Sequence, residues 1–119
     1  MRYHTISFKH AVDGIIYSLR TQPNFRIHLF FTVMAVMVGY FLQLLRWEWV
    51  ALWLAIFMVI VTEMLNTAIE SMTDLLTSEH RLAAKIAKDT AAGMVLITAV
   101  GSIVIGIFIF VPHLFQFMN

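Results

Sequence analysis

Long apolar runs alternate with short polar segments along this chain, and three of the runs are long enough to cross a bilayer. Residues 27–45 contain no Asp, Glu, Lys or Arg. At about 1.5 Å per residue they cover roughly 28 Å, close to the thickness of a membrane's hydrocarbon core. A second span is predicted over about 49–75 and a third over about 82–112. The pattern therefore predicts an all-α integral membrane protein with three transmembrane helices.

The segment before the first span has a different pattern. Over about 5–20, apolar residues such as Phe8 and Ile15 share one helical face, while charged residues such as Lys9 and Asp13 lie away from it. This distribution predicts an amphipathic helix that lies on the membrane surface. A Gln-Pro-Asn sequence then separates that helix from the first span.

Polar side chains line one face of the second span. Residues 49–62 carry no charge, and Glu63, Asn66, Glu70 and Asp74 follow them. At about 100° per residue these four side chains fall within an arc of roughly 80°. A carboxylate that faces lipid costs several kcal/mol, so ionisable residues in such a segment usually face a partner or a functional cavity. We call these four residues the polar stripe, and their alignment indicates a functional site.

A second charged face is predicted at the start of the third span, one short connection later. It consists of Arg81, Lys85, Lys88 and Asp89, and a helical hairpin can bring it opposite the polar stripe. A buried carboxylate can act as a base, carboxylates nearer water suit Mg²⁺ together with substrate phosphates, and lysine suits phosphate oxygens. This combination favours phosphoryl transfer from a nucleotide to a lipid hydroxyl. The chain has no G-x-x-x-x-G-K-[ST] sequence, so nucleotide binding is expected to use side chains and metal.

Composition and charge agree with a membrane location. The chain is 61% hydrophobic and 13% charged, with a net charge of +1 and no cysteine, which gives no reason to expect nucleic acid as a partner. Basic residues flank the start of the first span and the second connection, whereas Arg46 alone lies on the other side. The positive-inside rule therefore predicts a cytoplasmic N-terminus and an external C-terminus in the inner cell membrane.

The same residues resemble a known family. The sequence EMLNTAIESMTD at 63–74, followed by SEH at 78–80 and AKDTAAG at 87–93, resembles the prokaryotic diacylglycerol kinase and undecaprenol kinase family. FKHA at 8–11 and FRIH at 25–28 match its N-terminal part. The resemblance covers nearly the whole chain, and the E-x-x-N-[TS]-A-I-E-x-x-x-D block is specific.

This resemblance implies a homotrimer of three-span subunits with active sites shared between subunits, which uses ATP and Mg²⁺ to phosphorylate diacylglycerol or undecaprenol. It implies that Glu63 accepts the proton of the lipid hydroxyl and that Asn66 helps to bind the lipid. Gln22 stands where many relatives carry a glutamate, and an amide oxygen can still coordinate a metal. The implied metal ligands are Glu70 and Gln22, and the implied ATP-binding residues are His10, Gln22, Glu70, Glu79, His80, Lys88 and Asp89.

Other interpretations of these residues stay open at this point. Glu63 alone would also suit a small proton-coupled transporter, and a structural or pore-forming protein is a third class. Glu63 and Asn66 could simply join helices by hydrogen bonds, and Asp74 could equally lie on a solvated helix end. Arg81 and Lys85 are interpreted as topology anchors that contact lipid phosphate. Three histidines are predicted to be interfacial: His4, His28 and His113.

Overall fold

Four helices make up the described part of the chain. The computed structural model describes the backbone of residues 2–119 and the side chains of residues 7–119. The helices are α1 (Arg2–Thr21), α2 (Pro23–Leu42), α3 (Arg46–Leu76) and α4 (Leu82–Met118). Three of them, α2, α3 and α4, are long and apolar enough to cross a membrane. The predicted fold class, three membrane helices preceded by an amphipathic helix, is confirmed.

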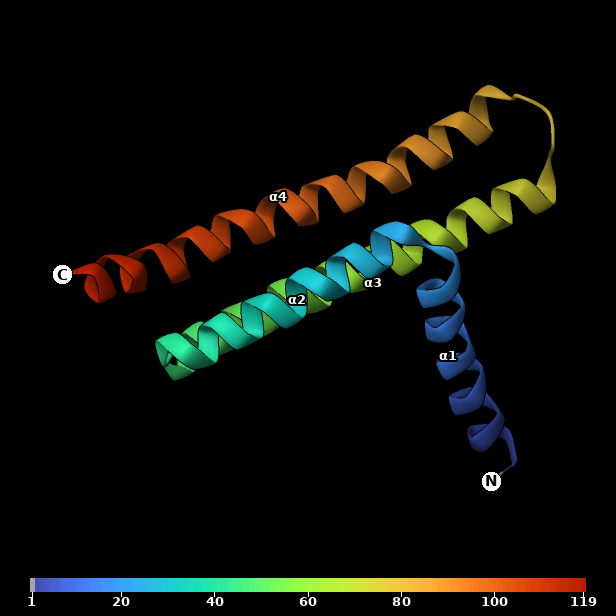
Figure 1. Ribbon diagram of the computed structural model, residues 1–119. Coiled ribbons are helices and arrows are strands. Elements are labelled where there is room, and N and C mark those ends of the chain that lie inside the picture. The colour runs from blue at the N-terminus through green and yellow to red at the C-terminus, as the bar shows by residue number, and fades with distance from the viewer. Residues whose placement is uncertain (1) are drawn as a thin grey trace.

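The three long helices pack side by side, with α3 in the middle of the contacts (Figure 1). Within an apolar stretch of 18 residues in each helix, 39% of the residues of α3 are buried, compared with 11% in α2 and 6% in α4. Most of the surface of α2 and α4 is therefore free to face lipid. The core is small and consists of Leu44, Leu52, Ile56 and Ile109.

A tight turn joins α2 to α3. Gln43 adopts the left-handed conformation with a φ of 57°, and the N–H of Leu44 donates to the carbonyl of Gly39 at 3.2 Å. A Cβ at position 39 would lie 2.8 Å from Leu44 Cδ1 and 3.1 Å from Trp49, so this position needs glycine. The turn ends α2 at Leu42, three residues earlier than the predicted boundary at residue 45.

α1 leaves the long helices at a steep angle, starting from the junction before Pro23 (Figure 1). Pro23 is the first residue of α2, where its missing N–H breaks no helical hydrogen bond. Ser18 and Phe25 are buried on either side of the junction, while Phe8 farther along α1 is 74% exposed. An apolar face that is left uncovered on a helix crossing the others matches a helix lying on the membrane surface.

The helices are unequal in length, and this places part of the chain beyond the bilayer. At 1.5 Å per residue, the 20 residues of α2 measure about 30 Å, the 31 of α3 about 46 Å and the 37 of α4 about 55 Å. Figure 1 shows that the last turns of α3 and the first turns of α4 extend past the point where α1 leaves. We call this projecting part the hairpin end, and the opposite end, with the α2–α3 turn and the end of α4, the far end.

At the far end α4 runs through Pro112 to Met118, past the predicted boundary at residue 112. A proline in a helix removes one hydrogen bond but does not have to end the helix. The apolar residues that follow continue the same helix.

Candidate functional site

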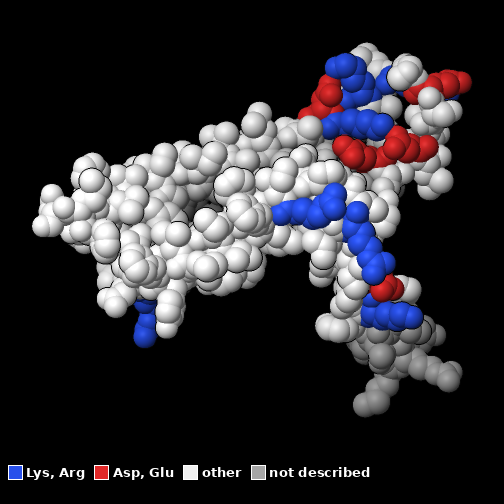
Figure 2. Space-filling model, viewed as in Figure 1, with Lys and Arg blue, Asp and Glu red and all other residues white. Residues whose placement is uncertain are grey.

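A dense group of acidic and basic side chains lies at the hairpin end, and further charged side chains follow α1 (Figure 2). The polar stripe starts at the buried Glu63 and runs along α3 into this region. The site residues expected from the sequence fall into two groups. One surrounds an open hollow between the last turn of α3 and the first turns of α4, and the other surrounds Glu63 deeper in the bundle.

The hollow at the hairpin end has a volume of about 810 Å³, which is within the range of small-molecule sites. Four of the expected ATP-binding residues line it, namely Glu79, His80, Lys88 and Asp89. Its other charged lining residues are Asp74, Arg81 and Lys85. The hairpin therefore brings carboxylates, lysines and an arginine around one space of suitable size for a charged ligand.

Ion pairs join these side chains. Lys88 Nζ on α4 contacts Asp74 Oδ1 on α3 at 2.6 Å, which confirms the prediction that the charged face opposes the polar stripe. Within α4, Lys85 Nζ contacts Asp89 Oδ2 at 2.6 Å. The side chains of Lys85 and Lys88 are 72% and 42% exposed. Exposed pairs of this kind contribute little to stability, so phosphate oxygens can replace the carboxylates at small cost.

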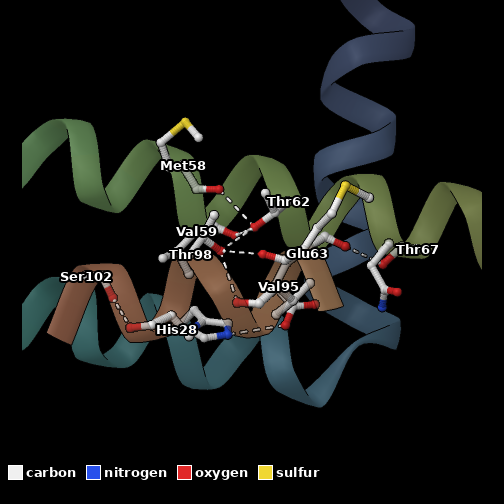
Figure 3. A network of polar contacts seen from close by, with 12 residues as sticks. His28, Met58, Val59, Thr62, Glu63, Thr67, Val95, Thr98 and Ser102 are labelled. Atoms are coloured by element: carbon white, nitrogen blue, oxygen red, sulfur yellow. Dashed lines mark hydrogen bonds and ion pairs between the residues drawn. The ribbon is translucent and has the colours of Figure 1, made fainter. Parts of the chain in front are cut away.

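Glu63 lies in a different environment. Its residue surface is only 2% exposed, and its Oε1 lies 3.2 Å from Nε2 of His28 on α2. The hydroxyl groups beside it are engaged elsewhere (Figure 3): Thr62 bonds to Thr98 on α4 at 2.9 Å, and Thr67 donates to the main-chain carbonyl of Glu63. Three helices thus meet around one carboxylate that has a single ion-pair partner among the described residues.

Asn66 and Glu70 continue the stripe one and two turns nearer the hairpin end. Asn66 Nδ2 donates to Glu70 Oε1 at 3.4 Å. The side-chain amide oxygen of Asn66, Oδ1, is buried and has no hydrogen-bond donor within the described part of the chain. A buried acceptor without a donor is uncommon in proteins and costs free energy. A ligand hydroxyl next to Glu63 would supply the missing donor.

No group of three or more His, Cys, Asp or Glu side chains converges on a metal-sized space among the described residues. Mg²⁺ does not require one, because it binds through one or two carboxylates together with substrate phosphates and water. Glu70 fits this need, since it forms no ion pair within the described residues. It therefore keeps acceptor oxygens for a cation.

The structure does not bring His10 and Gln22 to the hollow. His10 is exposed on α1, and Gln22 is half-buried at the start of α2, where its side chain makes no capping hydrogen bond. Neither residue lines the hollow of the same chain. Their expected roles in ATP and metal binding remain predictions.

Two histidine contacts were not foreseen from the sequence. His28 and His113 were predicted only to be interfacial, yet His28 contacts Glu63, and His113 Nε2 contacts both Glu48 oxygens at 2.9 and 3.0 Å. The signal that could have found them is the rule that an acid inside an apolar helix needs a partner. His4 lies outside the side chains that the structure describes.

Comparison with known proteins identifies this arrangement. Residues 9–110 match the model of the family described as prokaryotic diacylglycerol kinase. The chain belongs to this family. The expected family membership is thereby confirmed, and the protein is a membrane-bound lipid kinase, as its buried carboxylate and charged hollow led us to expect. The alternatives of a transporter or a purely structural protein are not supported.

Two similar proteins are named as lipid kinases. The chain is 43% identical over 108 residues to the undecaprenol kinase of Bacillus subtilis, a match that covers 91% of this chain and 88% of the relative. It is 40% identical over 115 residues to the diacylglycerol kinase of Synechocystis, where the match covers 95% of this chain and 65% of the relative. The two identities are too close to select between the two lipids.

Proposed function

We propose that this lipid kinase transfers the γ-phosphate of ATP, bound with Mg²⁺, to a primary hydroxyl of diacylglycerol or undecaprenol. The product is phosphatidic acid or undecaprenyl phosphate. The observation that supports the proposal best is the placement of Glu63: a buried carboxylate at the level of the surface helix, on the same helix as the charged hollow. The names of the two relatives supply the acceptor lipids.

At the lipid side, Glu63 is proposed to take the proton of the hydroxyl as that oxygen attacks the γ-phosphate. The side-chain amide oxygen of Asn66, one turn away, has no donor among the described residues and is proposed to accept a hydrogen bond from the lipid headgroup. Both groups lie on α3, so the hydroxyl is held in one orientation by a rigid element. Such positioning lowers the barrier without any covalent intermediate.

At the nucleotide side, Lys88 exchanges its contact with Asp74 for a phosphate oxygen, and Glu79, His80 and Asp89 contact the rest of the nucleotide in the hollow. Glu70 would hold the cation of the metal–ATP complex, and the chemistry that Mg²⁺ would supply there is neutralisation of charge on the phosphates. His10 on α1 and Gln22 at the start of α2 lie outside the hollow of the same chain, so their proposed contacts with the nucleotide require a neighbouring subunit.

The separation of the two groups supports the proposed homotrimer. Glu63 and Asp74 are eleven positions apart along α3, which is about 16 Å at the helical rise. The carboxylate and the hollow of a single chain are therefore about three helical turns apart. A hairpin end from a neighbouring subunit, docked on the open face of α2 or α4, would complete the site.

This arrangement can be tested by mixing two impaired proteins at an ATP concentration well below KM. A preparation with Glu63→Gln lacks the base, and one with Lys88→Ala lacks a phosphate contact. If subunits share sites, trimers formed from both variants contain sites with both residues intact, so activity rises above that of either variant alone. Mixed trimers, verified by cross-linking, that show no such rise would indicate that each chain builds its own site.

The proposed orientation places the hairpin end and the N-terminus in the cytoplasm, where ATP is available, and the C-terminus outside. Basic residues of the hairpin end and of α1 lie on this side, while Arg46 lies at the far end, as the positive-inside rule requires. Modification of an introduced cysteine at position 79 or 117 in sealed cells, by a reagent that does not cross membranes, tests this orientation.

The decisive experiment measures the activity directly. Purified protein in detergent is given labelled ATP, Mg²⁺ and either diacylglycerol or undecaprenol, with Glu63→Gln as the inactive control. Transfer of label to one lipid supports the proposal and identifies the acceptor. Absence of transfer to both lipids, with folded protein, would refute it.

A further inference from the structure

If Glu63 accepts a proton in each catalytic cycle, it must release that proton before the next cycle, and its burial limits direct release to water. Its side chain is 3% exposed, whereas that of His28 is 24% exposed. The hydroxyls of Thr62 and Thr67 donate to main-chain carbonyls, and a hydroxyl is in any case a poor proton acceptor. His28 Nε2, at 3.2 Å, is the basic group in reach.

The position of His28 makes it suitable for this task. It is the sixth residue of α2, about 8 Å along the axis from the junction with the surface helix. It also lines, together with Thr32 and Ser102, one end of a groove of about 310 Å³ between α2, α3 and α4 whose other lining residues are mostly apolar. Its imidazole contacts the enclosed carboxylate (Figure 3), while 24% of its side chain remains exposed.

No competing charge is present around this contact. Among the described side chains, Glu63 and His28 each form one ion pair, with each other. α4 contributes only the hydroxyls of Thr98 and Ser102 beside them, and the charged residues that α1 contributes, Lys9, Asp13 and Arg20, form no ion pair with either group. A proton that leaves Glu63 therefore has His28 as its only titratable neighbour in the described structure.

We propose that His28 is a positioning residue of the lipid kinase reaction, which orients Glu63 and takes from it the proton of the lipid alcohol. This inference rests on the proposed role of Glu63 as the base. The alcohol O–H bond breaks and its proton passes to Glu63, while the oxygen's electron pair forms a bond to the γ-phosphorus. The bond from that phosphorus to the bridging oxygen breaks, and ADP leaves with its electron pair.

The second step regenerates the base. Neutral Glu63 gives its proton to Nε2 of a neutral His28, which at that moment carries its own proton on Nδ1. The result is an imidazolium beside a carboxylate, an arrangement that the 3.2 Å contact already accommodates. The imidazolium then releases a proton to water at the membrane surface, and the pair is ready for the next lipid.

The proposed mechanism predicts that a change at His28 affects the first turnover and later turnovers differently. In His28→Gln the amide can still contact Glu63 but cannot accept a proton. The first phosphoryl transfer at each site should keep its rate, and later turnovers should slow by at least about tenfold because Glu63 stays protonated. Rapid-quench measurement with labelled ATP should then show a burst of one lipid phosphate per site. The matched control is His113→Gln, which removes the other histidine–glutamate contact, and it should show no burst.

A second variant provides an independent measurement. In His28→Ala, added imidazole should restore the rate of the later turnovers, because the small base fits the space left by the side chain. This measurement decides the matter even if His28→Gln does not fold.

Each outcome separates this inference from the proposed function. If unmodified protein and His113→Gln phosphorylate lipid and His28→Gln has the same steady rate, the inference is overturned and the kinase assignment stands. Equal loss of the first and later turnovers in His28→Gln, without rescue of His28→Ala by imidazole, overturns it as well. If unmodified protein phosphorylates neither lipid, the proposed function itself fails.

Discussion

Two histidine–glutamate contacts hold opposite ends of this small bundle, and they differ in how completely the carboxylate is satisfied. At the far end, both oxygens of Glu48 contact Nε2 of His113, at 2.9 and 3.0 Å, and Glu48 accepts a hydrogen bond from the N–H of Leu45 at 2.9 Å. Near the hairpin end, Glu63 has one contact with His28, at 3.2 Å. Both carboxylates are buried, at 4% and 2% exposure.

The difference shows how a structural acid can be distinguished from a chemical one. Contacts from two polar groups leave Glu48 less capacity to accept a ligand, and the His113 contact joins the start of α3 to the end of α4. Glu63 keeps free acceptor positions, and the neighbouring Asn66 has a buried oxygen without a donor in the described residues. An incompletely satisfied buried group is costly for stability alone, which is why it indicates function.

The largest expected effect on kcat comes from replacing Glu63, and replacement of Glu48 serves as its control. Glu63→Gln should lower kcat by about 10²- to 10⁴-fold, because the general base is lost while the side chain keeps its size. Glu48→Gln should keep kcat within about twofold. The two variants are compared by steady-state lipid phosphorylation at saturating ATP. Equal kcat values for both would remove the distinction drawn here.

A smaller effect is expected in the hollow. Lys88→Ala should raise KM for ATP by about ten- to a hundredfold, because a charge-assisted contact to phosphate is worth roughly 1.5–3 kcal/mol. Lys85→Ala is the matched control on the same helix, since Lys85 is more exposed and pairs within α4. An ATP titration of both variants measures the difference. A larger effect at Lys85 than at Lys88 would contradict the assignment of the phosphate contact.

The metal ligand is tested by the concentration of Mg²⁺ needed for half-maximal activity. Glu70→Ala should raise it about three- to tenfold, because one carboxylate ligand is lost while the substrate phosphates remain. Asp74→Ala removes the next acid of the stripe as a control. An unchanged Mg²⁺ titration in Glu70→Ala would exclude Glu70 as the ligand.

The smallest effect on activity, and the clearest on stability, is expected at the far end. His113→Gln should lower the free energy of unfolding by about 1–3 kcal/mol, because it leaves Glu48 buried with fewer hydrogen bonds. Thermal unfolding in detergent measures this change, and kcat is determined alongside it. Unchanged stability would show that the contact at the far end is dispensable.

The sequence was sufficient to predict the architecture, because membrane-spanning helices can be recognised by their length and apolar composition. It also predicted that Lys88 and its neighbours oppose the polar stripe, since a five-residue connection leaves two adjacent helices little choice. The family followed from the motif at 63–74. Helix ends were less accurate: the turn at Gln43 depends on how Leu44 and Trp49 pack against Gly39, which no local pattern reveals.

The partners of the buried acids could not be predicted from the sequence. His28 and Glu63 are separated by 34 positions, and whether they meet depends on the rotation of α2 against α3. That rotation is set by packing of side chains such as Leu52 and Ile56. The spacing of polar residues within one helix gives a face, but it does not say which residue of another helix lies against it.

The crosswise placement of α1 has a consequence for bilayers of different thickness. A helix resting in the headgroup plane fixes the position of the enzyme relative to one leaflet, so the vertical distance from that plane to Glu63, the proposed proton acceptor, is built into the fold. A thicker or thinner hydrocarbon layer then has to be accommodated at the other surface, where α4 has residues to spare. With the proposed cytoplasmic N-terminus, the level of the reaction follows the inner leaflet, and differences in acyl-chain length are accommodated at the outer one.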